Sequence, residues 1–342
     1  MKNWYIFLLC GLFLGILGLW CSRETMEASA PKYLLKLATV APDGSSWMKI
    51  MEKMDEELRQ KTQGEVGFQI YGGGRAGEEG AVLEKMRDGE YHAAGFTGLG
   101  LGKIYKDTRV LQLPFLYKNY SEYDYVLKKI HRKLWRGIYK NGFIHLGWAE
   151  GGFVNLFSKK RLTSLSDIQN SSLWLRQGDP FLKEMFKGLG IVAPVPLGLQ
   201  DVLPMLQTGK VDTFGVSPLA CVALQWHSEV NYCLAYDIYN ITAALVISKK
   251  VWFRLPKSYR LPLYKTVKKY AKKLVATSRR DNEKAKKDLL KMGIENIQPS
   301  SAQVQEMLRK GKEIREYLLK KQIFSAKILN RVQKILEKKR KK

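Results

Sequence analysis

Three glycines, Gly72, Gly74 and Gly77, stand at the spacing of a dinucleotide-binding loop. They follow an expected strand and precede an expected helix, where backbone amides can hold a pyrophosphate. Glu78 and Glu79 come directly afterwards, and carboxylates at a helix start repel phosphate. A lone glycine pattern is weak, so we expect a sharp strand-to-helix turn here. An NAD-dependent oxidoreductase that uses the 72–77 loop is the alternative.

Other residues capable of catalysis or metal binding are dispersed along the chain. The four histidines lack metal-ligand spacing, and no CxxC pair, G-x-S-x-G, H-E-x-x-H or P-loop motif occurs. Cys221 and Cys233 could form a disulfide in an oxidising compartment or remain buried free thiols. We therefore expect no catalytic residue, no metal and no cofactor, and a protein that is not an enzyme.

The N-terminus has the pattern of an export signal. Lys2 precedes an unbroken apolar run over residues 4–20, and Cys21 follows it. The length also approaches that of a membrane span, so a retained anchor is an alternative. Cys21 suggests lipoprotein processing, although Trp20 stands where a small residue usually precedes the cysteine. Residues 1–21 are predicted to be a signal peptide or lipoprotein signal, and the folded part to lie in the periplasm, with lipid anchoring through Cys21 left open.

Basic residues are concentrated toward the C-terminus. The 342-residue chain has a net charge of +26, and residues 251–342 contain 28 Lys or Arg against 8 Asp or Glu. For an exported protein this asymmetry favours an anionic membrane surface or an acidic partner over nucleic acid. Solvated helix faces are the equally weighted alternative.

Hydrophobic spacing predicts alternating strands and helices. The pattern predicts strands at 34–40, 67–71, 91–96, 143–148, 173–176, 213–216, 232–236 and 243–248, and helices at 47–58 and 81–87. Helical spacing dominates from residue 258 onward, with one very long run toward residue 289. The alternation predicts an α/β architecture with largely parallel sheets.

One internal similarity indicates two related lobes. Leu83, Gly89 and Gly95 recur at the same spacing as Leu203, Gly209 and Gly215. In each copy a helix would end at a glycine and lead into a strand with a second glycine. Two such units suit two lobes that face each other across a ligand cleft.

Several short motifs, in this order, resemble the solute-binding proteins of TRAP (tripartite ATP-independent periplasmic) transporters, the DctP family. The resemblance covers residues 33–298, and its pieces are LATVAP at 37–42, YGGGRAG at 71–77, LPFL at 113–116, the segment 165–190 and LQTGKVD at 206–212. It implies a two-lobed periplasmic binding protein fold with a hinge, an inter-lobe cleft and a long connecting helix. The implied lobes are residues 32–152 with 242–281, and residues 153–241 with 282–342.

The resemblance also implies a ligand and an anchor for it. The family typically binds organic acids, and Arg176 occupies the position of the arginine that pairs with the ligand carboxylate. A guanidinium offers paired donors in a fixed fork that fits a carboxylate. Without the resemblance, an arginine paired with a protein carboxylate would be the more common situation.

Two departures from the family pattern point to a more hydrophobic ligand. Val154 stands where many members carry a second arginine, and no amide follows Asp212. We predict a cleft lined, besides Arg176, by mainly apolar side chains. The predicted set is Trp47, Phe96, Phe153, Val154, Phe214, Val216 and Tyr236. Aromatic residues at these spacings are more often part of a core, which is the competing interpretation.

The expected function is capture of a small carboxylate or amphipathic ligand and its delivery to TRAP membrane subunits. A helical-repeat (TPR) lipoprotein is a further partner suggested by analogy, and nucleic acid is not expected. A third class is an exported interaction protein that uses the basic helices expected at 302–319 and 323–335.

Overall fold

A five-stranded sheet forms the centre of the first lobe. The computed structural model describes residues 30–341, and the strand order in this sheet is β2-β1-β3-β10-β4. The strand bounds are β1 (Tyr33–Thr39), β2 (Val66–Tyr71), β3 (Ala93–Thr97), β4 (Phe143–Phe153) and β10 (Asn240–Ser248). β1 pairs in parallel with β2 and β3, whereas β10 is antiparallel to both β3 and β4.

The second lobe has a four-stranded sheet of order β11-β9-β5-β8 and a separate pair, β6-β7. The bounds are β5 (Asn155–Ser158), β6 (Trp174–Arg176), β7 (Val195–Leu197), β8 (Thr213–Val216), β9 (Tyr232–Leu234) and β11 (Glu295–Ile297). β5 is antiparallel to β8 and β9. The expectation of largely parallel sheets is therefore wrong. β10 runs antiparallel to both of its neighbours in the first sheet, and β5 does the same in the second. Both sheets therefore contain parallel and antiparallel pairs.

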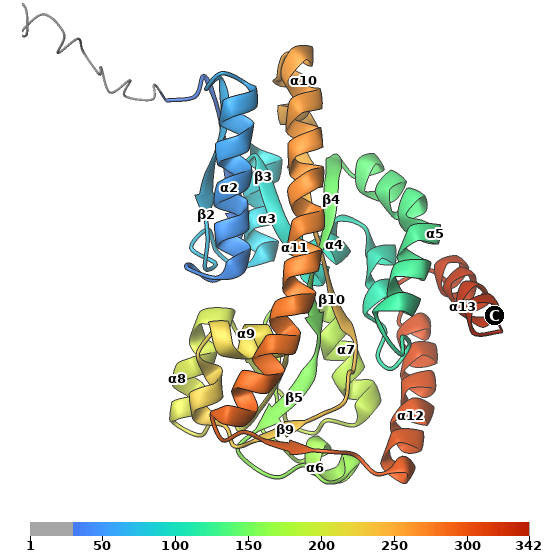
Figure 1. The fold of residues 1–342 in the computed structure, drawn as a ribbon. Helices are drawn as coiled ribbons and strands as arrows, with labels where there is room; N and C mark the ends of the chain where they lie inside the picture. Colours follow the sequence, from blue (N-terminus) through green and yellow to red (C-terminus); the bar gives the residue numbers. More distant parts are fainter. Residues whose placement is uncertain (1–29, 342) are drawn as a thin grey trace, which may run out of the picture.

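Helices cover both sheets (Figure 1). Their bounds are α2 (Ser46–Lys61), α3 (Glu79–Asp88), α4 (Gly98–Ile104), η1 (Lys106–Gln112), α5 (Tyr120–Lys140), α6 (Leu165–Gln169), α7 (Pro180–Leu189), η2 (Leu199–Asp201), α8 (Val202–Gln207), α9 (Pro218–Ala223), η3 (Trp226–Glu229), α10 (Lys249–Arg254), α11 (Lys257–Lys291), α12 (Ser301–Lys320) and α13 (Ala326–Arg340). In the described part of the chain, no helix is both long and apolar enough to cross a bilayer.

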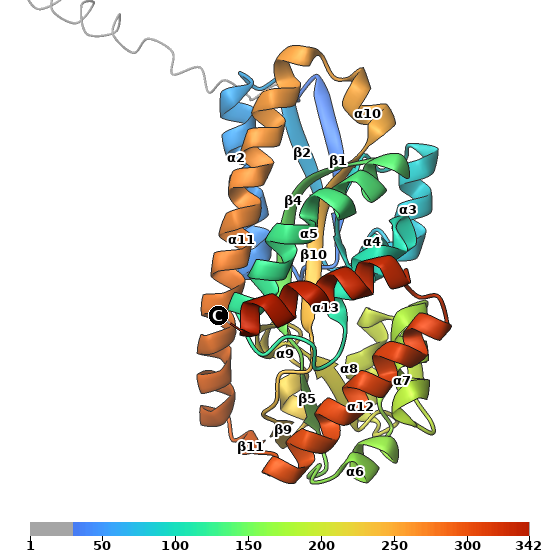
Figure 2. The same cartoon turned by 90° about the vertical axis from the view of Figure 1, so that its right-hand side faces the viewer.

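Three segments connect the lobes. β4 leads into β5 with one residue between them, and β10 returns from the second lobe to the first. α11 runs along both lobes, packing against α2 and β4 in the first and against α9 in the second. Its Asn282 donates to the carbonyl of Gly151 at 3.0 Å and accepts from the backbone N–H of Leu219 at 2.9 Å. The predicted two-lobed fold with a long connecting helix is confirmed (Figures 1 and 2).

The repeated glycine units have the predicted helix-turn-strand form. Gly89 ends α3 with φ of 91°, and Gly209 follows α8 with φ of 74°. Both values lie in the left-handed region that glycine adopts without a steric cost. Each unit then leads into a strand, β3 in the first sheet and β8 in the second.

The C-terminal helices pack on different parts of the molecule. α12 packs against α7, whereas α13 packs against α5 and η1 of the first lobe (Figure 2). The predicted residue boundaries of the two lobes, which place residues 282–342 in the second, stay a prediction. Four apolar residues of α13, namely Ile328, Leu329, Val332 and Leu336, are buried.

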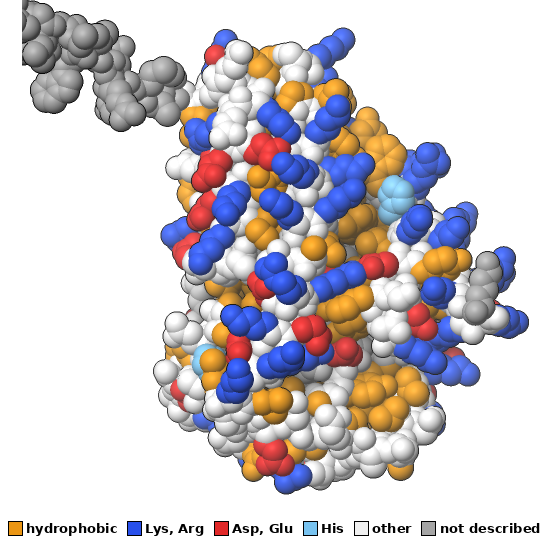
Figure 3. Space-filling view, viewed as in Figure 1, with side chains coloured by type: hydrophobic (Ala, Val, Ile, Leu, Met, Phe, Trp, Pro, Cys, Tyr) orange, Lys and Arg blue, Asp and Glu red, His pale blue; other side chains and the backbone are white. Residues whose placement is uncertain are grey.

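The positive charge is spread over helix surfaces. Lys and Arg side chains lie across the face that carries α11 (Figure 3). Lys265, Lys268, Lys269 and Lys272 of this helix are exposed, while Leu263, Val267 and Leu274 are buried against the core. The basic residues of α11 thus occupy the solvated side of an amphipathic helix.

Candidate functional site

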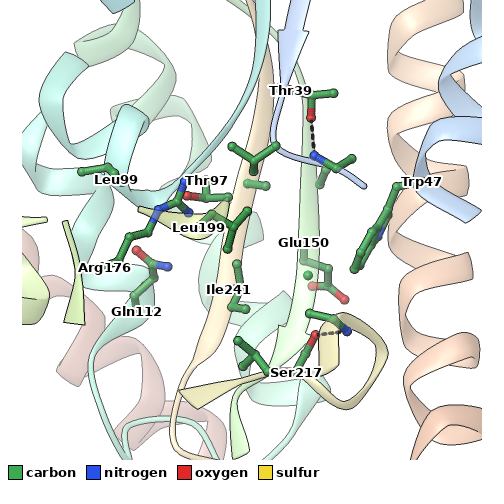
Figure 4. A pocket seen from close by; sticks show the side chains of 18 of the residues that line it. Thr39, Trp47, Thr97, Leu99, Gln112, Glu150, Arg176, Leu199, Ser217 and Ile241 are labelled. Atoms are coloured by element: carbon green, nitrogen blue, oxygen red, sulfur yellow. Dashed lines mark hydrogen bonds between the residues drawn. The ribbon is translucent and has the colours of Figure 1, made fainter. Parts of the chain in front are cut away.

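A cavity with a volume of about 190 Å³ lies between the lobes. The first lobe contributes residues from the carboxyl ends of β1 and β3, from α2 and from η1; the second contributes β6, α7, β8 and α9. Ligands in α/β sheets bind outside the carboxyl ends of strands, where loops leave the sheet. This inter-lobe cavity, called the cleft below, is the candidate site (Figure 4).

Arg176, at the end of β6, forms one side of the cleft and faces carboxylates from the opposite lobe. Its Nη2 lies 3.3 Å from Glu78 Oε2 and 3.7 Å from Glu79 Oε1. Only 11% of the arginine side chain is exposed. Burial lowers the pKa of Arg176, but attraction to Glu79 and Glu78 outweighs this and raises the pKa above its ordinary value. The guanidinium therefore remains charged.

The two glutamates are held differently. Glu79 is buried, and it accepts hydrogen bonds from the N–H and hydroxyl of Thr97, both at 3.0 Å, and from the Gly100 N–H at 2.7 Å. Glu78 is the N-cap residue of α3, and it accepts a hydrogen bond across the cleft from the Leu199 N–H at 3.0 Å. Glu79 is thus fixed within its own lobe, whereas Glu78 bridges the lobes.

A second buried ion pair joins the lobes beside Arg176. Arg109 Nη2 donates to both carboxylate oxygens of Asp179, at 2.9 and 3.0 Å, and its guanidinium lies 4.2 Å from the centre of the Phe181 ring. The Nε atoms of Arg109 and Arg176 are both buried and have no hydrogen-bond partner among the described residues. An unpaired buried donor costs about 1–3 kcal/mol, so a ligand that supplies acceptors here would recover that energy.

The opposite side of the cleft is formed by Trp47 and apolar residues. Trp47 Nε1 donates to Ser278 Oγ at 2.7 Å, and this hydroxyl donates to the Glu150 carbonyl at 2.9 Å. The Glu150 carboxylate is already paired with Arg279, 2.5 Å away, and with the Asn240 amide at 3.0 Å. Leu274, Val216 and Ala220 also line the cleft. The cleft therefore has one charged end and one mainly apolar end.

The structure brings some of the predicted site residues to the cleft and places others elsewhere. Arg176, Trp47 and Val216 line the cleft, and Val154 lines a second cavity. Phe96, Phe153 and Phe214 lie in the cores, each at most 3% exposed, and Tyr236 packs on Phe115 with the ring centres 5.9 Å apart. These four do not line the cleft, and a ligand-binding role for the predicted set stays a prediction.

Strand alternation explains the placement of Phe96. Successive strand residues face opposite sides of a sheet. In β3, Gly95 and Thr97 line the cleft, so Phe96 between them points into the core. In β8, Phe214 packs in the core with its ring centre 5.5 Å from that of Phe157, although Val216, two residues further along the strand, lines the cleft.

Sequence reasoning missed the polar cleft residues Thr39, Thr97, Arg109, Gln112 and Asp179. Thr39 and Thr97 could have been found, because each lies within one residue of the end of a predicted strand, at the edge where ligands bind. No local pattern marks Arg109 or Asp179.

The glycine loop at 72–77 is a turn. Gly73, Gly74 and Gly77 have φ of 59°, 76° and 104°, and the N–H groups of Gly73 and Gly74 donate to the carbonyls of Ala41 and Thr39. Two backbone amides that would have to bind a phosphate therefore already donate to carbonyls at and just after the end of β1. This is the predicted strand-to-helix turn.

The described residues were also considered as metal ligands and as reactive thiols. Within residues 30–341, no group of three or more His, Cys, Asp or Glu side chains could hold a metal ion. Cys221 and Cys233 are free and buried. Burial raises the pKa of Cys233 to about 12 and that of Cys221 well above its ordinary value, so both thiols are inert.

Two α/β lobes joined by crossing strands, with a cavity between them, define a ligand-capturing binding protein. Comparison with known proteins agrees with this class. Residues 37–322 match the model of the DctP family, described as bacterial extracellular solute-binding protein, family 7. The chain belongs to this family, which confirms the predicted resemblance and the predicted role as a solute receptor.

Three similar proteins illustrate the family. The sialic acid-binding periplasmic protein SiaP of Vibrio cholerae is 22% identical over 69% of this chain and 73% of that protein. The sugar acid binding protein DctPAm of Advenella mimigardefordensis, in complex with galactonate, has a TM-score of 0.83 at 21% identity, covering 90% of this chain and 99% of that one. DctP7 of Bordetella pertussis, a receptor binding pyroglutamic acid, has a TM-score of 0.81 at 16% identity, covering 89% and 99%.

These matches are solute receptors, and they lend no support to the oxidoreductase or interaction-protein alternatives. The family is described as extracellular. The predicted signal at 1–21 and the predicted lipidation of Cys21 lie outside the described residues.

Proposed function

We propose that the chain is the extracytoplasmic receptor of a TRAP-type secondary transporter and that its ligand is an organic acid with a sizeable apolar body. The observation that carries the proposal is the pair of unpartnered Nε donors of Arg109 and Arg176 at the charged end of the cleft. A carboxylate fits such donors best, because charge-assisted hydrogen bonds to guanidinium are strong and directional.

The apolar end of the cleft supports the second half of the proposal. Trp47, Met51 and Leu274 line it, and the nearby Glu150 carboxylate is already neutralised by Arg279. A polyhydroxylated acid would leave several hydroxyl groups facing these apolar side chains without partners, which is unfavourable. Galactonate, sialic acid and pyroglutamic acid, named for the relatives, share the carboxylate with the ligand proposed here.

The mechanism is capture and delivery without chemical conversion, so we propose that the chain is not an enzyme. A ligand that contacts both lobes stabilises the closed form, because those contacts exist only when the lobes meet. The closed form would then dock on the TRAP membrane subunits. Export to the periplasm fits this role, while lipidation of Cys21 and a helical-repeat lipoprotein partner stay predictions.

Mass spectrometry of the molecule released by denaturing the gently purified protein tests the proposal. We expect a carboxylic acid with an apolar body at about one molecule per chain. A dinucleotide, or a sugar acid at the same stoichiometry, would contradict the proposed ligand class.

A further inference from the structure

A second cavity, called the annex below, lies inside the second lobe beneath α7 and α12. Its volume is about 60 Å³. The walls are almost wholly apolar and include Leu182, Met185, Phe186 and Leu189 of α7 and Met307 of α12. Lys310 is the charged residue in the wall, and its amino group is 3.0 Å from Glu313. The annex therefore offers apolar surface and no unpaired charge.

The annex borders the cleft at its charged end. Trp174, Leu182, Gly215 and Tyr239 line both cavities. Trp174 and Arg176 belong to the same short strand, and Leu182 lies one turn after Asp179. A ligand whose carboxylate binds Arg176 would therefore lie next to the wall that separates the cleft from the annex.

Gly215 makes this boundary thin. A Cβ atom at this position would lie 3.2 Å from Val154 Cγ1 and 3.4 Å from Leu156 Cδ2, both in side chains of the annex wall. An added side chain here would push Val154 and Leu156 toward the annex. The absence of one leaves the cleft and the annex separated only by the neighbouring side chains.

The far wall is held in a fixed shape. Phe115 has φ of 54°, in the left-handed region that a bulky residue rarely adopts. Its N–H donates to the Ile238 carbonyl at 2.7 Å, and α12 accommodates its ring next to Gly311, where an added Cβ would lie 2.9 Å from Phe115 Cδ2. Trp174 is likewise fixed by a hydrogen bond from Nε1 to the Leu197 carbonyl at 3.1 Å. The annex is thus built into the packing of the lobe.

We propose that the annex receives the hydrocarbon tail of a medium-chain monocarboxylate whose carboxylate is held at Arg176. The inference rests on the proposed function and narrows its ligand class to unbranched acids with a flexible alkyl tail. An apolar cavity holds water poorly, whereas methylene groups gain free energy by leaving water. Each methylene that enters the annex should raise affinity about fourfold.

Isothermal titration calorimetry of the full mature chain with butanoate, hexanoate, octanoate and decanoate tests the proposal. We expect the dissociation constant to fall steeply along the series until the annex is full and then to level off. Gly215→Ala should flatten the series, because octanoate and decanoate lose most of their gain in affinity over butanoate measured with the same variant. Met185→Ala enlarges the annex and should move the plateau to a longer acid.

Leu308→Ala is the matched control, because Leu308 lies on α12 but is 39% exposed. It should reproduce the wild-type series. Equal affinity for all four acids would overturn the annex proposal and leave the proposed function intact. If none of the four acids binds, and gluconate or a dinucleotide binds instead, the proposed function fails as well.

Discussion

The guanidinium of Arg176 lies 3.3 Å from the carboxylate of Glu78, and the two residues come from opposite lobes. The residue proposed to anchor the ligand is therefore already paired with a carboxylate of the protein. Glu78 is 35% exposed, so water screens the pair and its contribution to stability is small. In the proposed complex the ligand carboxylate takes the place of Glu78 at Arg176, while the Leu199 N–H continues to donate to Glu78.

Replacing this internal counter-ion should strengthen acid binding. Glu78→Gln removes the competing charge but keeps an acceptor for Leu199, so we expect affinity for the carboxylate ligand to rise by up to about fivefold, which corresponds to about 1 kcal/mol for a screened pair. The melting temperature without ligand should fall slightly. Calorimetry with the wild type measured in parallel checks this, and a weaker affinity would mean that Glu78 organises the site instead of competing in it.

Loss of the arginine should have the opposite effect. Arg176→Ala is expected to weaken binding of the acid by about 2–4 kcal/mol, because a desolvated charge-assisted pair is lost. Arg176→Lys should recover only part of this, since lysine lacks the two-pronged fork. Arg75→Ala is the control, because Arg75 is 58% exposed on the nearby glycine turn and pairs with Asp43. Unchanged affinity in Arg176→Ala would assign the arginine a purely structural role.

The last helix should prove necessary for stability. Deleting residues 326–342 removes four buried apolar side chains from the core and the ion pair between Arg340 and Glu122 at 2.8 Å. We expect a loss of several kcal/mol in the free energy of unfolding, since burial of each such side chain contributes about 1.5–3 kcal/mol. Thermal denaturation followed by circular dichroism measures it.

A charge variant separates this packing role from a docking role for the basic tail. Lys334→Ser with Lys338→Ser removes two charges from exposed positions of α13, and it should leave the melting temperature unchanged. If the truncated protein melts at the same temperature as the wild type, α13 does not stabilise the core. That result would favour the alternative of an exported interaction protein that uses its basic helices.

Buried His145 should make the protein sensitive to acid. Burial, with a smaller effect of His131, lowers the pKa of His145 from 6.5 to about 3. Between these values the unfolded chain binds a proton that the folded protein excludes, so the stability contributed by neutral His145 is complete above pH 6.5 and is lost as the pH falls toward 3. The melting temperature should therefore drop over this window, and less steeply in His145→Phe. Parallel pH profiles for the two proteins would contradict this account.

Much of the scaffold was predictable because its signals are local. The predicted strands at 34–40 and 67–71 correspond to β1 and β2, and the long helical run corresponds to α11. The short strands β5, β7 and β11 were missed, whereas β6, β8 and β9, which are equally short, were predicted. The position of Arg176 at the cleft also followed from the sequence, through the motif that surrounds it.

The sequence alone determined the family, the two repeated helix-turn-strand units and the arginine at the end of β6, because each is written within a few neighbouring residues. The tertiary structure decided the rest of the site. It paired Arg176 with Glu78 across 98 residues and Arg109 with Asp179 across 70. It also turned Phe96 and Phe214 into the cores and opened the annex beside Gly215. These features depend on how distant segments pack, and no local spacing encodes which side of a strand will meet the opposite lobe.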